Sequence, residues 1–148
     1  MKIGTVFEIS YAHRLMYHPG KCSGLHGHNG KVEVEIEGPV HAPSGMVLDF
    51  DRIKGTVRDW VMRHLDHVTI LQEGDPLLES IGGRLVTMSH PPTAEMLAAA
   101  ILKDGLYNLV YLNGGSATVR FWETSNCYAE ASTKDGPDLG FPWYWDVK

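Results

Sequence analysis

The stretch KVEVEIE, residues 31–37, alternates strictly between charged and branched apolar side chains. Successive side chains of a strand point to opposite faces, so this stretch predicts a strand with one charged and one apolar face. An apolar sheet face must be covered by another layer. We therefore expect a sheet whose apolar face is packed against helices.

Two helices are predicted between the outer strands. From Asp49, a potential N-cap, apolar residues recur at helical spacing, and this helix should end near Leu65. Thr93 follows two prolines and is a natural cap for a second helix over Met96–Lys103, which Gly105 can terminate. The apolar stripe of the first helix consists of Ile53, Val57, Trp60 and Val61.

Three further segments read as strands: residues 2–12, Ala117–Thr124 and Tyr128–Ser132. The element order is then ββααββ, which predicts an α+β fold with an antiparallel sheet and two helices on one face. A sheet of four strands has two open edges, and edges are paired or protected in native proteins. An oligomer that joins sheets edge to edge is therefore expected.

Length and composition set the class of protein. The 148 residues suit one domain, 1–148, with a core of about residues 2–133 and an aromatic tail, 134–148, that packs on a surface. No apolar run approaches a membrane span, and a net charge of −5 without a basic cluster disfavours nucleic acid as a partner. Glu8 interrupts what would be the apolar part of a signal peptide, so we expect a cytoplasmic protein.

Histidines are the candidate metal ligands. His26 and His28 flank a glycine, and on an extended backbone their rings point to the same face. His13, at the end of the first strand, can supply a third ligand if the two strands pair. Three neutral nitrogens suit zinc and leave a fourth position open for water or substrate. The alternative is a chance pair of histidines on a strand.

Other candidates carry weaker signals. Cys22 precedes His26 by four residues and can be a fourth metal ligand, an inert buried thiol or a reactive group beside the metal. Asp66 beside His67 can orient the imidazole for proton transfer, although Asp-His is also a common helix cap. Two cysteines, Cys22 and Cys127, are too few for a disulfide framework.

Glu123 is placed by strand alternation on the apolar face, where a carboxylate needs a partner. A guanidine-like edge, such as that of a pterin or guanine, satisfies a carboxylate with two donors. The alternative is a strand end at which the carboxylate simply reaches water.

Taken together, these motifs resemble the 6-pyruvoyl-tetrahydropterin synthase / 6-carboxy-tetrahydropterin synthase family from about residue 7 to residue 132. The most specific combination is C-x-x-x-H-G-H at 22–28 with A-H-x-L upstream and L-D-H downstream. Gly30 stands where the family usually has an aromatic residue, and Ile9 replaces a common Phe. The motifs that carry the resemblance are residues 22–28, 45–50, 65–67, 92–95 and 123–124.

The resemblance implies a T-fold subunit assembled as trimers that close a β-barrel and stack into a homohexamer, with sites between subunits. It implies that His13, His26 and His28 hold Zn²⁺ and that Cys22 is the general base. Asp66 and His67 would form a proton relay. Glu123 would anchor the pterin ring.

The activity implied is that of 6-carboxy-5,6,7,8-tetrahydropterin synthase, a zinc-dependent lyase. It converts 7,8-dihydroneopterin triphosphate into carboxytetrahydropterin, acetaldehyde and triphosphate on the way to queuosine. One alternative is 6-pyruvoyl-tetrahydropterin synthase, which uses the same substrate but keeps the carbon chain. A different class of alternative is a non-catalytic metal- or pterin-binding module.

Overall fold

A computed structural model describes residues 1–106, 109, 115–135 and 145–147. Its centre is a hairpin of two long antiparallel strands, β1 (Lys2–His13) and β2 (His26–Glu37). The pairing runs without a break from Lys2 opposite Glu37 to His13 opposite His26. The predicted alternation of residues 31–37 is confirmed, because Val32, Val34 and Ile36 are buried while the intervening residues are not.

Within the described residues the hairpin is part of a seven-stranded sheet in the order β6-β5-β2-β1-β3-β4-β7. On one side, β5 (Ser116–Trp122) pairs with β2, and β6 (Tyr128–Ser132) pairs with β5, both antiparallel. On the other side lie the short strands β3 (Val68–Gln72) and β4 (Leu85–Met88). β3 runs parallel to β1, and β4 runs parallel to β3.

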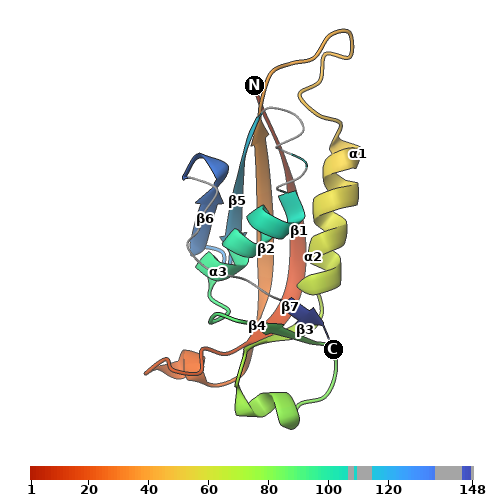
Figure 1. Ribbon diagram of the computed structural model, residues 1–148. Coiled ribbons are helices and arrows are strands. Elements are labelled where there is room, and N and C mark those ends of the chain that lie inside the picture. Colours follow the sequence, from red (N-terminus) through yellow and green to blue (C-terminus); the bar gives the residue numbers. More distant parts are fainter. Residues whose placement is uncertain (107–108, 110–114, 136–144, 148) are drawn as a thin grey trace.

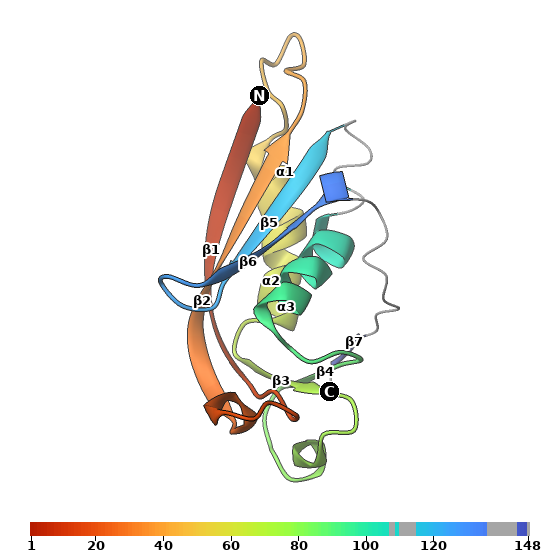
Figure 2. The same cartoon turned by 90° about the vertical axis from the view of Figure 1, so that its left-hand side faces the viewer.

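Two helical segments cover one face of the sheet (Figures 1 and 2). The first joins α1 (Phe50–Ile53), a π-helical turn (Lys54–Arg58) and α2 (Asp59–His64). The second joins α3 (Ala94–Ala100) to another π-helical turn (Ile101–Leu106).

Both predicted N-caps are confirmed: the Asp49 side chain accepts from the Asp51 N–H, and Thr93 accepts from the Met96 N–H. The first helical segment ends at His64, close to the predicted Leu65. The second passes through Gly105 rather than stopping there. Short 3₁₀ turns lie at Lys21–Ser23, Pro76–Glu79 and Thr133–Asp135.

The core lies between the sheet and the helices. It joins the apolar face of the hairpin to the predicted stripe of the first helix and to α3, and Trp60 of that stripe packs at its edge. Burial of one large apolar side chain in such a core stabilises the folded state by about 1.5–3 kcal/mol. Core residues from the three sources include Phe7, Ile9, Val32, Val34, Ile53, Val57, Val61, Leu97 and Ile101.

The predicted α+β fold, with two helices on one face of the sheet, is confirmed. The expectation of only four strands, all antiparallel, is wrong, because β3 and β4 extend the sheet in parallel next to β1. Of the predicted tail, residues 136–144 and 148 lie outside the described residues. Trp145–Val147 form β7, which pairs with β4. Among the described residues, no helix has the length and apolar character required to cross a bilayer.

Candidate metal centre and neighbouring residues

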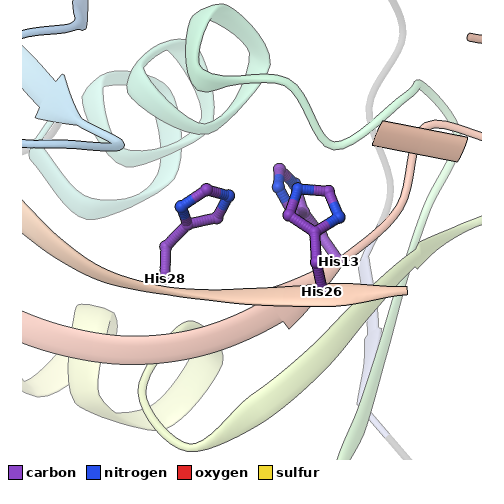
Figure 3. Close-up of side chains that lie close together, drawn as sticks. All are labelled: His13, His26 and His28. Carbon is purple, nitrogen blue, oxygen red and sulfur yellow. The ribbon is translucent and has the colours of Figure 1, made fainter. Parts of the chain in front are cut away.

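Three histidines converge at the end of the central hairpin. The register places His13 of β1 directly opposite His26 of β2, and His28 shares their face of the sheet. One ring nitrogen of each residue lies within 4.8 Å of the other two. Figure 3 shows the three rings on the same side of the strands, facing a common point. The predicted convergence of His13, His26 and His28 is therefore present in the folded chain.

Backbone carbonyls orient two of these rings. Nδ1 of His13 lies 2.7 Å from the carbonyl oxygen of Pro92, the residue before the Thr93 cap of α3. Nδ1 of His26 lies 2.8 Å from the carbonyl oxygen of Gly24. A ring whose Nδ1–H donates to a carbonyl presents the lone pair of Nε2, which is the usual support for a metal-binding histidine.

The remaining nitrogens fit a cation. Nε2 of His13 and Nε2 of His28 are buried and have no hydrogen-bond partner among the described residues. Burial lowers the pKa of both histidines below its usual range, although the carboxylate of Glu123 acts in the opposite direction. This shift favours the neutral form of both rings, which is the form that binds a metal. Three imidazole nitrogens are a donor set suited to Zn²⁺.

Glu123 lies at the mouth of this cluster, immediately after β5. Its Oε1 atom is 3.4 Å from Nε2 of His13 and 3.7 Å from Nε2 of His28, and its side chain is 30% exposed. Ligand atoms of a tetrahedral zinc site are roughly 3.3 Å apart. A cation held by the histidines would thus lie within reach of this carboxylate, whose position on the apolar face matches the expectation from strand alternation.

Cys22 lies in the loop that joins β1 to β2, within the 3₁₀ turn Lys21–Ser23. Its carbonyl oxygen accepts from the Leu15 N–H at 2.8 Å, which closes the base of this loop. The thiol is partly buried and is a free cysteine. It is not among the atoms that lie within 4.8 Å of one another in the histidine cluster. The geometry therefore does not support Cys22 as a fourth ligand.

Asp66 and His67 form a pair next to β1. Nδ1 of His67 lies 2.8 Å from the Asp66 carboxylate, and the other carboxylate oxygen accepts from the Ser10 N–H at 3.0 Å. Burial opposes ionisation of Asp66, but the bonds from Ser10 and His67 outweigh it and hold the pKa of the carboxyl below its usual range. The His67 ring is bonded to this carboxylate rather than to a helix carbonyl, so the helix-cap reading is not supported.

The backbone of His67 is also constrained. Its φ of 53° lies in the left-handed region, which is uncommon for residues other than glycine. Its N–H donates to the carbonyl oxygen of Ser10 at 2.7 Å. These contacts fix where the pair sits, beside a depression of about 460 Å³ lined by Glu8, Ile9, Ser10, Asn29, Asp66 and His67.

The pair and the histidine cluster lie on opposite faces of the hairpin. Asp66 and His67 line one depression together with Ser10 and Asn29, whose side chains are bonded to each other and alternate along the hairpin with the histidine-bearing positions. One chain therefore does not bring Asp66 and His67 together with His13, His26 and His28.

Tyr11 is a residue of the site that the sequence analysis missed. It lies directly opposite His28, and its ring centroid is 5.2 Å from that of His13 and 5.6 Å from that of His28. Burial, and secondarily the charge of Glu123, raise the pKa of Tyr11 far above its usual range. The available signal was Gly30, because a missing side chain leaves space for a ring from the neighbouring strand.

The sheet, its two helical segments and the three-histidine centre define a T-fold protein with a candidate metal site. The family model described as 6-pyruvoyl tetrahydropterin synthase matches residues 2–134. The chain belongs to this family, whose members are enzymes that act on pterins.

Curated relatives share the family resemblance along most of the chain. The 6-carboxy-5,6,7,8-tetrahydropterin synthase of Haemophilus influenzae is 32% identical over 139 residues, covering 87% of this chain and 96% of that protein. The protein of that name from Rickettsia felis is 31% identical over 83% of this chain and 94% of its own length. A probable 6-carboxy-5,6,7,8-tetrahydropterin synthase of Halobacterium salinarum is 39% identical over 64% of this chain and 62% of its own.

Solved structures establish the fold. An uncharacterized protein from Wolinella succinogenes superposes with a TM-score of 0.74 at 23% identity, covering 88% of this chain and 97% of that chain. The 6-pyruvoyl tetrahydropterin synthase of Caenorhabditis elegans gives a TM-score of 0.63 at 23% identity, covering 88% and 94%. The predicted T-fold is thereby confirmed.

The geometry of the cluster predicts that His28→Ala abolishes tight Zn²⁺ binding. Changes to groups that merely support metal ligands cost about 10- to 100-fold in affinity, and loss of a direct ligand should cost more. Zinc content after dialysis, measured by elemental analysis, checks this. His41→Ala, in an exposed loop, is the matched control and should keep about one zinc per chain. Stoichiometric zinc in His28→Ala would contradict the assignment.

Proposed function

We propose that this protein is a zinc-dependent 6-carboxy-5,6,7,8-tetrahydropterin synthase that converts 7,8-dihydroneopterin triphosphate, with release of acetaldehyde and triphosphate, in queuosine biosynthesis. The observation that supports it most is the three-histidine centre, in a chain whose curated relatives carry that name. The alternative of 6-pyruvoyl-tetrahydropterin synthase shares the substrate and the expected centre, and it differs in keeping the carbon chain.

His13, His26 and His28 would hold the Zn²⁺ ion. When bound, the ion supplies Lewis acidity that makes protons near a coordinated substrate oxygen easier to remove. The Pro92 and Gly24 carbonyls keep the rings of His13 and His26 turned so that Nε2 faces the centre. Because the rings are already oriented, the site would bind Zn²⁺ without a rearrangement of its backbone.

Cys22 would act as the general base. Its loop also carries Gly24, which orients His26, so the thiol belongs to the same loop as a ligand without belonging to the ligand set. A nearby cation favours the thiolate form of a cysteine, and the thiolate is the form that accepts a proton.

Asp66 and His67 would move a proton to or from the substrate. The bond from Nδ1 of His67 to Asp66 leaves Nε2 of His67 for the transfer, and the side chain of His67 is 76% exposed. Since this pair lies on the other face of the hairpin from the histidine cluster, we propose that it serves the centre of a neighbouring subunit. A site shared in this way requires an oligomer, in line with the expected homohexamer.

Glu123 would hold the pterin ring, because a carboxylate pairs with two adjacent N–H donors of a guanidine-like edge. Its partly exposed carboxylate lies next to the metal centre, as expected for a group that fixes one end of a substrate whose other end meets the ion.

Product analysis tests the proposed activity. The zinc-loaded protein, incubated with 7,8-dihydroneopterin triphosphate, should release acetaldehyde and form the carboxylated pterin, both detectable by mass spectrometry. Triphosphate release without acetaldehyde would favour the pyruvoyl reaction. Pterin binding without any turnover would instead identify a non-catalytic binding module.

Cys22→Ala should retain full zinc occupancy and lose turnover by about 10²–10⁴-fold, the usual effect of removing a positioned acid–base group. The exposed Cys127 offers a matched control, and Cys127→Ala should have near wild-type turnover. Near wild-type turnover in Cys22→Ala would overturn its role as the base. Loss of zinc in that variant would show that it is a ligand.

Mixed oligomers test the shared site. Cys22→Ala and His67→Ala should each be inactive alone, because each lacks one half of every site. When the two variants are refolded together at equal amounts, random mixing should restore about one quarter of wild-type activity. A site is intact only when the subunit that supplies Cys22 carries the His67 substitution and the subunit that supplies His67 carries the Cys22 substitution. Each variant refolded alone is the control. Absence of any recovery, with mixing confirmed by two affinity tags, would place both residues in one subunit's site.

A further inference from the structure

Tyr11 lies inside the candidate site yet has no role in the chemistry described above. Its side chain is 3% exposed, and its ring contacts those of His13, His28 and Phe121. It belongs to the face of β1 that carries His13, two residues further along. Its ring therefore forms part of the inner wall of the histidine cluster.

Gly30 makes room for this ring. A Cβ atom at Gly30 would lie 3.1 Å from Cε1 of Tyr11 and 3.2 Å from the carbonyl oxygen of Trp122. Few real Cβ atoms approach their neighbours so closely, so any other residue at position 30 would press on the tyrosine ring. The same distances show that the ring extends across β2 toward Trp122, the residue that precedes Glu123.

The hydroxyl at the end of this ring is buried and has no hydrogen-bond partner among the described residues. A phenol is protonated at neutral pH, so this group is a donor without an acceptor. Burying an unpaired donor costs free energy, and phenylalanine would fill the same space without that cost. The hydroxyl therefore does not contribute to packing.

The Glu123 carboxylate is the complementary group. Its closest partners are Nε2 of His13 and Nε2 of His28. Nδ1 of His13 donates to the carbonyl oxygen of Pro92, so Nε2 of this ring is the nitrogen that presents a lone pair to the cluster. No other donor to this carboxylate is present among the residues that the structure describes. Among the described residues, the site thus holds a carboxylate without a hydrogen-bond donor and a hydroxyl without an acceptor, and both side chains lie against the rings of His13 and His28.

We propose that Tyr11 is a positioning residue that donates a hydrogen bond to the Glu123 carboxylate and holds it in the orientation that binds the pterin. His13 and His28 would hold a cation through their Nε2 atoms, and the Glu123 carboxylate would need a separate donor to keep it directed toward the substrate. The Tyr11 hydroxyl fixes that orientation. This proposal rests on the proposed function, in which Glu123 binds a pterin ring.

Tyr11→Phe tests the proposal because it removes one oxygen and keeps the ring. Fluorescence titration of the zinc-loaded protein with 7,8-dihydroneopterin should show affinity weakened by about 10- to 100-fold, the range for a hydrogen bond to a charged group. Zinc content should be unchanged, and the thermal midpoint of unfolding should be equal or higher. In turnover assays KM should rise while kcat stays within about 2-fold, since binding is affected more than chemistry.

A double-mutant cycle shows whether Tyr11 acts through Glu123. In a Glu123→Ala background, Tyr11→Phe should change pterin affinity by less than about 2-fold, because the acceptor is gone. Tyr128→Phe, an exposed tyrosine that packs on Trp122, is the matched control and should bind like the wild type.

The outcomes are distinguishable. Wild-type pterin affinity in Tyr11→Phe would overturn the role of Tyr11. The same holds if Tyr11→Phe weakens pterin affinity by the same factor with and without Glu123→Ala, because the two residues would then act independently. Loss of zinc in Glu123→Ala would also overturn it, because Glu123 would then be a metal ligand. Failure of the unaltered protein to bind 7,8-dihydroneopterin would overturn the proposed function, and with it this inference.

Discussion

The register of the β1–β2 hairpin is the constraint on which the site depends. It places His13 opposite His26 and Tyr11 opposite His28, so residues distant in sequence share one patch of one face. A slip of one residue would turn His13 to the other face and move the buried side chains of β1 into solvent. The core therefore protects the geometry of the candidate metal centre, because the same pairing buries Phe7 and Ile9.

The same alternation divides the functional groups between two faces. His13 and Tyr11 lie on the face covered by the helices, whereas Asp66 and His67 border the depression on the opposite face together with Ser10 and Asn29. The backbone layer of the sheet therefore separates these two groups within one chain. On the helix side, Nε2 of His13, Nε2 of His28 and the Tyr11 hydroxyl have no partner within the described part of the chain, and this costs free energy of folding that a bound metal and substrate would offset.

Features with a local physical cause could be predicted from the sequence. The strand at residues 31–37 follows from strict alternation, and the caps at Asp49 and Thr93 follow from side-chain oxygens that satisfy free N–H groups at helix starts. The shared direction of His26 and His28 follows from two-residue periodicity in a strand. The spacing of the motifs also indicated the family, since histidines at fixed offsets on one hairpin need no distant contact to be recognised.

Features that join distant segments were decided only by the tertiary structure. β3 and β4 are short apolar runs whose periodicity does not separate strand from helix, and their parallel pairing depends on β1. The carbonyl that orients His13 comes from Pro92, 79 residues away. The need for a glycine at position 30 is explained only by the Tyr11 ring, which packs against it in the folded chain. Sequence specifies which groups a residue carries, but which buried groups lack partners depends on how the sheet and helices enclose them.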